Sequence, residues 1–288
     1  MGLDYETFAN IMNHHIFQSE REDLLRTLVN HPERFVGLFR PTRPESKLFQ
    51  HIFQAREIKF GDAMEEIIGL MLESAGFVPQ DRRIAADLEC DHYFLFPDRK
   101  HALVIEQKVR DDHDSTKRRG QWENFEFKVR TLFSKHKDDL MAVFYFVDPS
   151  LHKNRNFYTS KIASLKENLG FDGIYLWYGK ELFTGLGLAQ YWDQLVTWLK
   201  RWKSEIPAMP DVNWETTEAV AELKKLTQRE PQLWLKFARC APLWQEGIVD
   251  SLFPTRKGLQ EIIKALQAQQ DEKAQRAAKA LLECLRTY

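Results

Sequence analysis

The chain has 288 residues, and its 41 Lys and Arg nearly balance its 42 Asp and Glu, which leaves a formal net charge of -1. A content of 43% hydrophobic and 29% charged residues is that of a folded globular protein and excludes a wholly disordered chain. A near-neutral chain can meet a polyanion only through a local basic patch. The three cysteines, Cys90, Cys240 and Cys284, are too few and too widely separated for a disulfide framework or a Cys-based zinc site.

The apolar runs of the sequence are short. None approaches the ~20 residues of a membrane span, and the longest, residues 141–147, has the length of a strand. The first residues carry neither the basic start nor the apolar core of a signal peptide. We therefore expect a cytoplasmic protein with no membrane partner.

Three regions differ in their residue patterns. Residues 1–58 show apolar residues at helical spacing and are predicted to form a helical N-terminal region. Residues 59–203 alternate between helical and strand patterns. Residues 204–288 are cut by prolines into short helices and end in an Ala/Leu/Gln/Lys-rich helix, which predicts a helical C-terminal region.

The middle region begins with a predicted helix over residues 62–75, with Gly61 as its start signal and Gly76 as its stop signal. Strands and helices follow, with strands at residues 77–84, 91–96, 102–109, 141–147 and 174–178, and helices at residues 121–134 and 188–203. This order predicts an α/β fold in which a mixed sheet is flanked by helices.

The run of residues 102–109 breaks its own apolar pattern near its end. Successive side chains of a strand point to opposite faces, so Glu106 and Lys108 share one face. Such a local inconsistency in an apolar strand is expected at functional sites. The alternative is an exposed ion pair on an edge strand, which contributes only ~0–1 kcal/mol. Apolar residues on both faces of the run favour a strand that is covered on each side.

Asp91 is the first residue of the preceding strand-like run, residues 91–96. Residues 97–100, with the sequence Pro-Asp-Arg-Lys, form a predicted turn that pairs this run with the next strand as a hairpin. Antiparallel pairing across that turn brings Asp91 towards the strand end that carries Glu106 and Lys108. The alternative role for Asp91 is to cap a turn.

Two converging carboxylates beside a lysine suit divalent-metal hydrolysis of a phosphodiester. Mg²⁺ prefers hard oxygen ligands and keeps several waters, so Asp91, Glu106 and the backbone carbonyl of Gln107 suffice to hold it. The metal would stabilise charge on the scissile phosphate and acidify a bound water. Lys108 would orient that water or neutralise the charge that develops on phosphorus. We therefore expect Asp91, Glu106 and Lys108 to be catalytic, with Mg²⁺ as the cofactor.

Asp91, followed fifteen residues later by Glu106-Gln107-Lys108, resembles the D…(D/E)-x-K signature of the PD-(D/E)XK nucleases. The proline that often precedes the aspartate is absent, because Glu89-Cys90 stands there. The segment Tyr178-Gly-Lys-Glu-Leu-Phe183 resembles the closing segment of many type II restriction endonucleases of this superfamily. The resemblance covers residues 59–190 and implies the restriction-endonuclease-like mixed sheet.

The segment from Gly61 to Glu65 has the pattern G-x-x-x-E, which resembles the core helix of the same family. In that family the glutamate often joins the metal site, so the resemblance implies that Glu65 is an accessory catalytic residue. The alternative is that an acid in the first turn of a helix only interacts favourably with the helix dipole.

A basic stretch follows the predicted site directly. Residues 115–137 contain seven Lys and Arg against two Glu, a net charge of +5 that is placed where a phosphate backbone would lie. Neutral donors accompany the charges and suit phosphates or base edges. We expect DNA contacts from Ser115, Thr116, Lys117, Arg118, Arg119, Gln121 and Asn124.

Other charged residues of this stretch are expected to be solvated. The basic residues from Lys128 to Lys137 are predicted to lie on the exposed face of an amphipathic helix whose apolar residues are core. Asp111, Asp112 and Asp114 are possible additional metal ligands, but we favour a solvated loop for them.

Together these patterns predict a Mg²⁺-dependent, sequence-specific endonuclease of double-stranded DNA, most similar to a type II restriction enzyme. The resemblance implies 5′-phosphate ends, a homodimer that matches a palindromic site, and a protective DNA methyltransferase in the same cell. One alternative is a structure-specific repair or junction nuclease with the same site. Another is a non-catalytic DNA-binding or interaction protein in which the acids and the lysine form only ion pairs.

Overall fold

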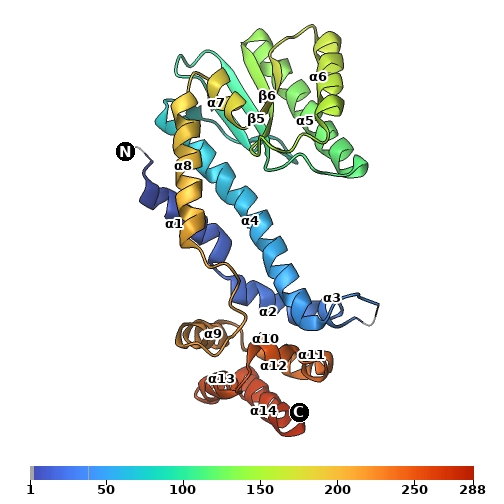
Figure 1. Ribbon diagram of the computed structural model, residues 1–288, viewed down its shortest axis with the longest axis vertical. Helices are drawn as coiled ribbons and strands as arrows, with labels where there is room; N and C mark the ends of the chain where they lie inside the picture. Colours follow the sequence, from blue (N-terminus) through green and yellow to red (C-terminus); the bar gives the residue numbers. More distant parts are fainter. Residues whose placement is uncertain (1–2, 38) are drawn as a thin grey trace. The chain divides into compact units, whose positions relative to one another are not determined.

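The computed structural model describes residues 3–37 and 39–288. The chain forms two compact units, each assembled from two stretches of the sequence (Figure 1). The sheet unit contains the described residues up to His15 together with Lys59–Ile206, and the helical unit contains Ile16–Ile58 together with Pro207–Tyr288. Helices α1 (Tyr5–Phe17) and α4 (Pro44–Ser74) contribute residues to both units.

The sheet unit is built on a five-stranded sheet with the order β1-β4-β5-β6-β7. The first three strands of this order pair antiparallel and the last three pair parallel, which confirms the predicted mixed sheet. Their bounds are β1 Val78–Pro79, β4 His92–Leu95, β5 Ala102–Lys108, β6 Leu140–Phe146 and β7 Ile174–Tyr178. A separate small hairpin consists of β2 (Arg83–Ala85) and β3 (Leu88–Glu89), so the single strand expected at residues 77–84 is wrong.

Helices flank this sheet, and two of them cover one of its faces (Figure 1). Trp122 and Phe125 of α5 and Tyr158 of α6 pack against Val104 of β5 and Phe144 of β6 in one buried cluster. The helices and the short 3-10 turn of this part of the chain are α5 Ser115–His136, η1 Lys137–Asp139, α6 Arg155–Leu169, α7 Lys180–Gly185 and α8 Ala189–Glu205. The first six residues of β5 are all buried, although successive side chains point to opposite faces. The strand is thus covered on both faces, as its apolar pattern predicts.

Helix α4 is longer than the sequence pattern indicates. We expected a helix to start after Gly61, but α4 begins at Pro44 and continues through that glycine to Ser74. An interior glycine costs a helix only about 1 kcal/mol relative to alanine. Burial of the apolar side chains of Met64, Ile67 and Met71 stabilises the helix by more than this cost, so the helix continues through Gly61.

Helix α6 has no counterpart in the sequence-based assignment. Strands β6 and β7 are parallel neighbours, and a parallel pair requires a crossover connection. The chain supplies this connection as α6, which buries Tyr158, Ile162 and Leu165.

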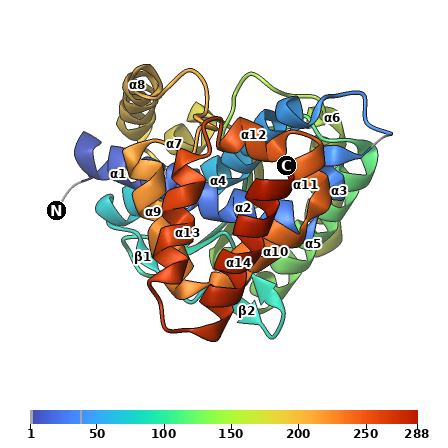
Figure 2. The same ribbon diagram turned by 90° about the horizontal axis from the view of Figure 1, so that it is seen from below.

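The helical unit contains helices from both ends of the sequence. Arg21 of α2 forms an ion pair with Glu222 of α9 at 2.6 Å, and Arg229 of α9 forms one with Glu22 of α2 at 2.7 Å. Figure 2 shows α9, α13, α14 and α10 side by side. Their buried apolar residues belong to one core cluster. The helices of this unit, besides parts of α1 and α4, are α2 Glu20–Asn30, α3 Glu33–Val36, α9 Thr217–Arg229, α10 Pro231–Arg239, α11 Ala241–Gln245, α12 Ile248–Leu252, α13 Lys257–Gln267 and α14 Glu272–Thr287.

Among the described residues, no helix has both the length and the apolar character that crossing a membrane requires.

Candidate active site

The hairpin of β4 and β5 places the predicted acids next to each other. His92 at the start of β4 pairs with Ile105, so Asp91 lies beside the strand end that carries Glu106 and Gln107. The backbone N–H of Gln107 donates a hydrogen bond to Oδ2 of Asp91 at 2.7 Å. This bond aims the Asp91 carboxylate at the end of β5, as the hairpin predicts.

Three oxygen atoms surround the ammonium group of Lys108. Its Nζ lies 3.1 Å from Oδ2 of Asp91, 2.8 Å from Oε1 of Glu106 and 2.8 Å from the carbonyl oxygen of Gln107. Two carboxylates and a carbonyl are hard oxygen donors of the kind that Mg²⁺ takes, and they already surround a positive charge. The residues present therefore fit a divalent cation.

The charge state of Lys108 follows from these contacts. Burial opposes its positive charge, but Glu106 and Asp91 together outweigh burial and raise the pKa of the ammonium group above its ordinary value. Lys108 is thus a permanent cation at neutral pH. Its side chain can donate hydrogen bonds and offset negative charge.

The oxygens around Lys108 include a backbone carbonyl as well as two carboxylates. Within residues 3–37 and 39–288, no group of three or more His, Cys, Asp or Glu side chains is arranged to hold a metal ion. The site at the end of β5 offers two such side chains, Asp91 and Glu106, and the third donor is the carbonyl of Gln107.

A second lysine reaches the same site. Nζ of Lys128 in α5 donates to Oε2 of Glu106 at 2.5 Å, and both side chains are about 95% buried. The expectation that Lys128 lies on a solvated helix face is therefore wrong. Its spacing from Phe125, Val129 and Leu132 puts it on the buried stripe of α5, a signal that the charge of the residue concealed.

The side chain of Gln107 is held on the opposite face of β5. Its Oε1 lies 2.9 Å from Nε2 of His92, a residue that the sequence analysis did not single out. Burial lowers the pKa of His92 below its ordinary value, which keeps the imidazole neutral. The side-chain oxygen of Gln107 is thus engaged with His92, while the backbone carbonyl of the same residue accepts from Lys108.

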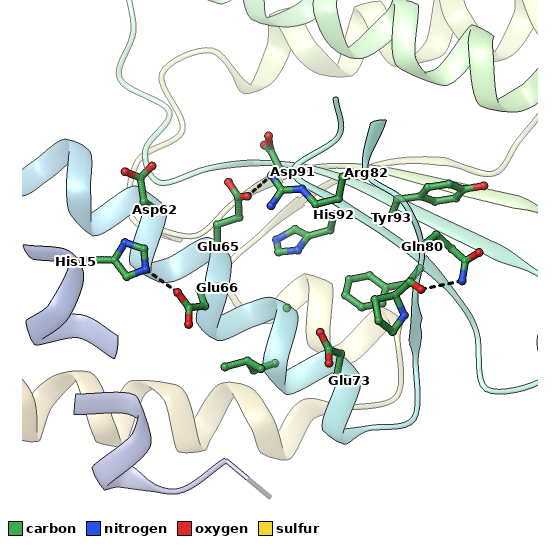
Figure 3. A pocket seen from close by; sticks show the side chains of 14 residues that line it. His15, Asp62, Glu65, Glu66, Glu73, Gln80, Arg82, Asp91, His92 and Tyr93 are labelled. Carbon is green, nitrogen blue, oxygen red and sulfur yellow. Dashed lines mark hydrogen bonds and ion pairs between the residues drawn. The ribbon is translucent and has the colours of Figure 1, made fainter. Parts of the chain in front are cut away.

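Glu65 of α4 lies in a pocket of about 470 Å³ that also contains Asp91 (Figure 3). The carboxylate forms an ion pair with the guanidinium of Arg82 at 2.5 Å. Burial raises the pKa of Glu65 to about 6, with the nearby charge of Asp91 as the second cause. The structure thus brings Glu65 to the site, but it joins an arginine and not the three oxygens around Lys108.

The residues expected to contact DNA occupy the first turns of α5 and divide into two groups. Five of them are exposed, namely Ser115, Thr116, Lys117, Arg119 and Asn124. The other two, Arg118 and Gln121, are partly buried and are engaged within the chain. Arg118 donates to Oδ1 of Asn154 at 2.9 Å, and Gln121 accepts from the hydroxyl of Tyr158 at 3.1 Å.

Asp111 is completely buried, so the solvated loop expected there is wrong for this residue. Its carboxylate accepts from the backbone N–H and the side-chain amide of Asn154, at 2.9 and 2.8 Å, and from the hydroxyl of Tyr178 at 2.9 Å. Asp112 is exposed, and Asp114 caps α5 by accepting from the N–H groups of Thr116 and Lys117. These bonds fix the loop that leads from the site to the basic turns of α5.

A family model matches the middle of the chain. Residues 77–203 match the model of the type II restriction endonuclease family HinfI, whereas no curated protein matches the chain. The matched stretch contains Asp91, Glu106 and Lys108 together with all of α5, and Glu65 lies before it. Over residues 77–203 the chain is therefore similar to the type II restriction endonucleases of the HinfI family.

Proposed function

We propose that this protein is a Mg²⁺-dependent, sequence-specific endonuclease that hydrolyses phosphodiester bonds of double-stranded DNA. The match to a restriction endonuclease family supports a site-specific nuclease with DNA as its partner. The observation that carries the proposal is the convergence of Asp91, Glu106 and the Gln107 carbonyl on a single cationic group, within 3.1 Å of it.

Asp91, Glu106 and the carbonyl of Gln107 would hold Mg²⁺, and Glu65 is an accessory residue beside them. Bound Mg²⁺ would supply charge stabilisation at the scissile phosphate and would acidify a water. The Asp91 carboxylate is already oriented by the N–H of Gln107. The protein therefore contributes a preorganised set of donors that needs little rearrangement.

Lys108 acts as a hydrogen-bond donor and a fixed positive charge. Its ammonium group orients the attacking water and offsets charge on the phosphate. In-line attack by this water leaves a 5′-phosphate and a 3′-hydroxyl, in keeping with the family resemblance. Replacement of Lys108 removes this charge without removing a metal ligand.

The exposed residues at the start of α5 form the proposed contact with the DNA backbone. They are Ser115, Thr116, Lys117, Arg119 and Asn124, and they follow the site directly in the chain. Arg118 and Gln121 support this surface through their bonds to Asn154 and Tyr158. A homodimer would bring two such sites to the two strands of a palindrome, and a methyltransferase would protect the host DNA.

Digestion of unmodified phage DNA with and without Mg²⁺, followed by sequencing of the ends, tests the proposal. We expect discrete fragments that require Mg²⁺, share one sequence at their ends and carry 5′-phosphates. Cleavage only at junctions or damaged DNA would favour the structure-specific nuclease. DNA that binds but stays intact with every divalent cation would contradict a nuclease altogether.

A further inference from the structure

Two lysines divide the carboxylate of Glu106 between them. Oε1 contacts Lys108, which also contacts Asp91 and the Gln107 carbonyl, whereas Oε2 contacts Lys128. We infer that Lys128 is a positioning residue that holds Oε2 of Glu106 and leaves only Oε1 to a divalent cation, so that the site favours Mg²⁺ over Ca²⁺. This inference rests on the proposed cation site at the end of β5.

Burial makes this contact restrictive. The side chains of Lys128 and Glu106 are each about 95% buried, so water does not compete for the bond. An unpaired ammonium or carboxylate at this depth is strongly disfavoured, which keeps Lys128 and Oε2 together. Glu106 can therefore bind a cation beside Asp91 through Oε1, but it cannot bind one cation with both of its oxygens.

The two cations differ in what they require from a carboxylate. Ca²⁺ accepts bidentate carboxylates in a flexible shell of six to eight oxygens, whereas Mg²⁺ demands near-ideal octahedral geometry. A carboxylate with one occupied oxygen therefore penalises Ca²⁺ more than Mg²⁺. The loss of one positive charge next to the site raises the affinity for both divalent cations alike. The ratio of the two affinities therefore separates the geometric effect of Lys128 from its charge.

The test uses the full chain without DNA. Binding of Mn²⁺ is followed by electron paramagnetic resonance, and Mg²⁺ and Ca²⁺ are titrated as competitors. We expect Lys128→Met, which keeps the length of the side chain but removes its charge, to raise the ratio of Ca²⁺ to Mg²⁺ affinity about tenfold, the lower end of the effect of outer-shell partners. An unchanged ratio in a folded Lys128→Met variant overturns the inference.

A second variant applies if Lys128→Met does not fold. Lys128→Arg keeps the buried charge, but its forked guanidinium can engage both oxygens of Glu106. We expect it to weaken binding of both cations with the ratio unchanged. Binding of both cations as in the wild type would contradict the inference.

Two controls locate the effect. Asp91→Asn should abolish Mn²⁺ binding, and persistence of that binding would place the ion elsewhere and overturn the inference. Lys135→Met removes an exposed charge from the same helix and should leave both affinities unchanged. A chain that binds cations in this Lys128-dependent way but cuts no DNA contradicts the proposed function alone. A chain that cuts DNA while Lys128→Met leaves the ratio unchanged contradicts this inference alone.

Discussion

Two buried acids, Glu106 in β5 and Asp111 in the loop that follows this strand, have different kinds of partner. Glu106 is surrounded by ammonium groups, those of Lys108 and Lys128. Asp111 accepts from neutral donors, namely the backbone N–H and the side-chain amide of Asn154 and the hydroxyl of Tyr178. A carboxylate paired with ammonium groups can exchange one of them for a metal ion, whereas a carboxylate inside a network of neutral donors holds a loop in place. The nature of the partner, and not burial, separates the proposed chemical site from the anchor.

The largest expected effect comes from removal of the cation between the two acids of the site. Lys108→Ala should lower the rate of DNA cleavage by about 10²–10³-fold, the range for loss of one preorganised electrostatic group. DNA affinity in Ca²⁺ should change little, because Lys108 is not a proposed DNA contact. Single-turnover cleavage rates and filter binding measure the two quantities. Wild-type cleavage by this variant would contradict the proposed role.

The next effect falls on stability. Asp111→Asn replaces an oxygen that accepts two hydrogen bonds with an amide that donates, so we expect a loss of about 2–4 kcal/mol in the free energy of unfolding. Urea titration measures this loss, and Asp112→Asn, at the exposed neighbouring position, should lie within about 0.5 kcal/mol of the wild type. An equally small effect at both positions would show that Asp111 does not anchor the loop.

Glu65 should make the free energy of unfolding depend on pH. Its pKa is raised from 4.5 to about 6 in the folded chain, so the fold loses stability as the pH rises through this range and the carboxylate ionises. Glu65→Gln removes that cost. We expect it to stabilise the chain by about 2 kcal/mol at pH 8 and to make no difference below pH 4.5.

Urea titrations of this variant and the wild type across pH, in the presence of a chelator, measure the difference. A gain that does not depend on pH would point to packing instead of ionisation.

The smallest effect concerns the surface of α5. Lys117→Ala should weaken DNA binding uniformly across sequences and lower the slope of log affinity against log salt by about 0.9, the value for one lost phosphate contact. Lys135→Ala, also exposed but at the other end of the helix, is the matched control and should keep the wild-type slope. Equal salt slopes for the two variants would show that the start of α5 does not contact the DNA backbone.

Much of the fold was visible in the residue pattern because the sheet is built from short apolar runs with clear ends. The strand predicted at residues 174–178 has the observed bounds, and that at residues 102–109 differs by one residue. The helix α6 was missed although Tyr158, Ile162 and Leu165 recur at helical spacing, because its many polar residues mask the stripe. Local signals also misled at Gly61, where burial of the following turns outweighs the cost of a glycine.

The sequence by itself determined that Asp91, Glu106 and Lys108 meet, because strand alternation and a short turn are local rules that operate within about twenty residues. Only the tertiary structure decided which partners Lys128 and Asp111 have. Lys128 lies 22 positions after the carboxylate it contacts, and the partners of Asp111 lie 43 and 67 positions after it. No local pattern carries such pairings, because a charged side chain enters the interior only when a distant segment supplies its partner there.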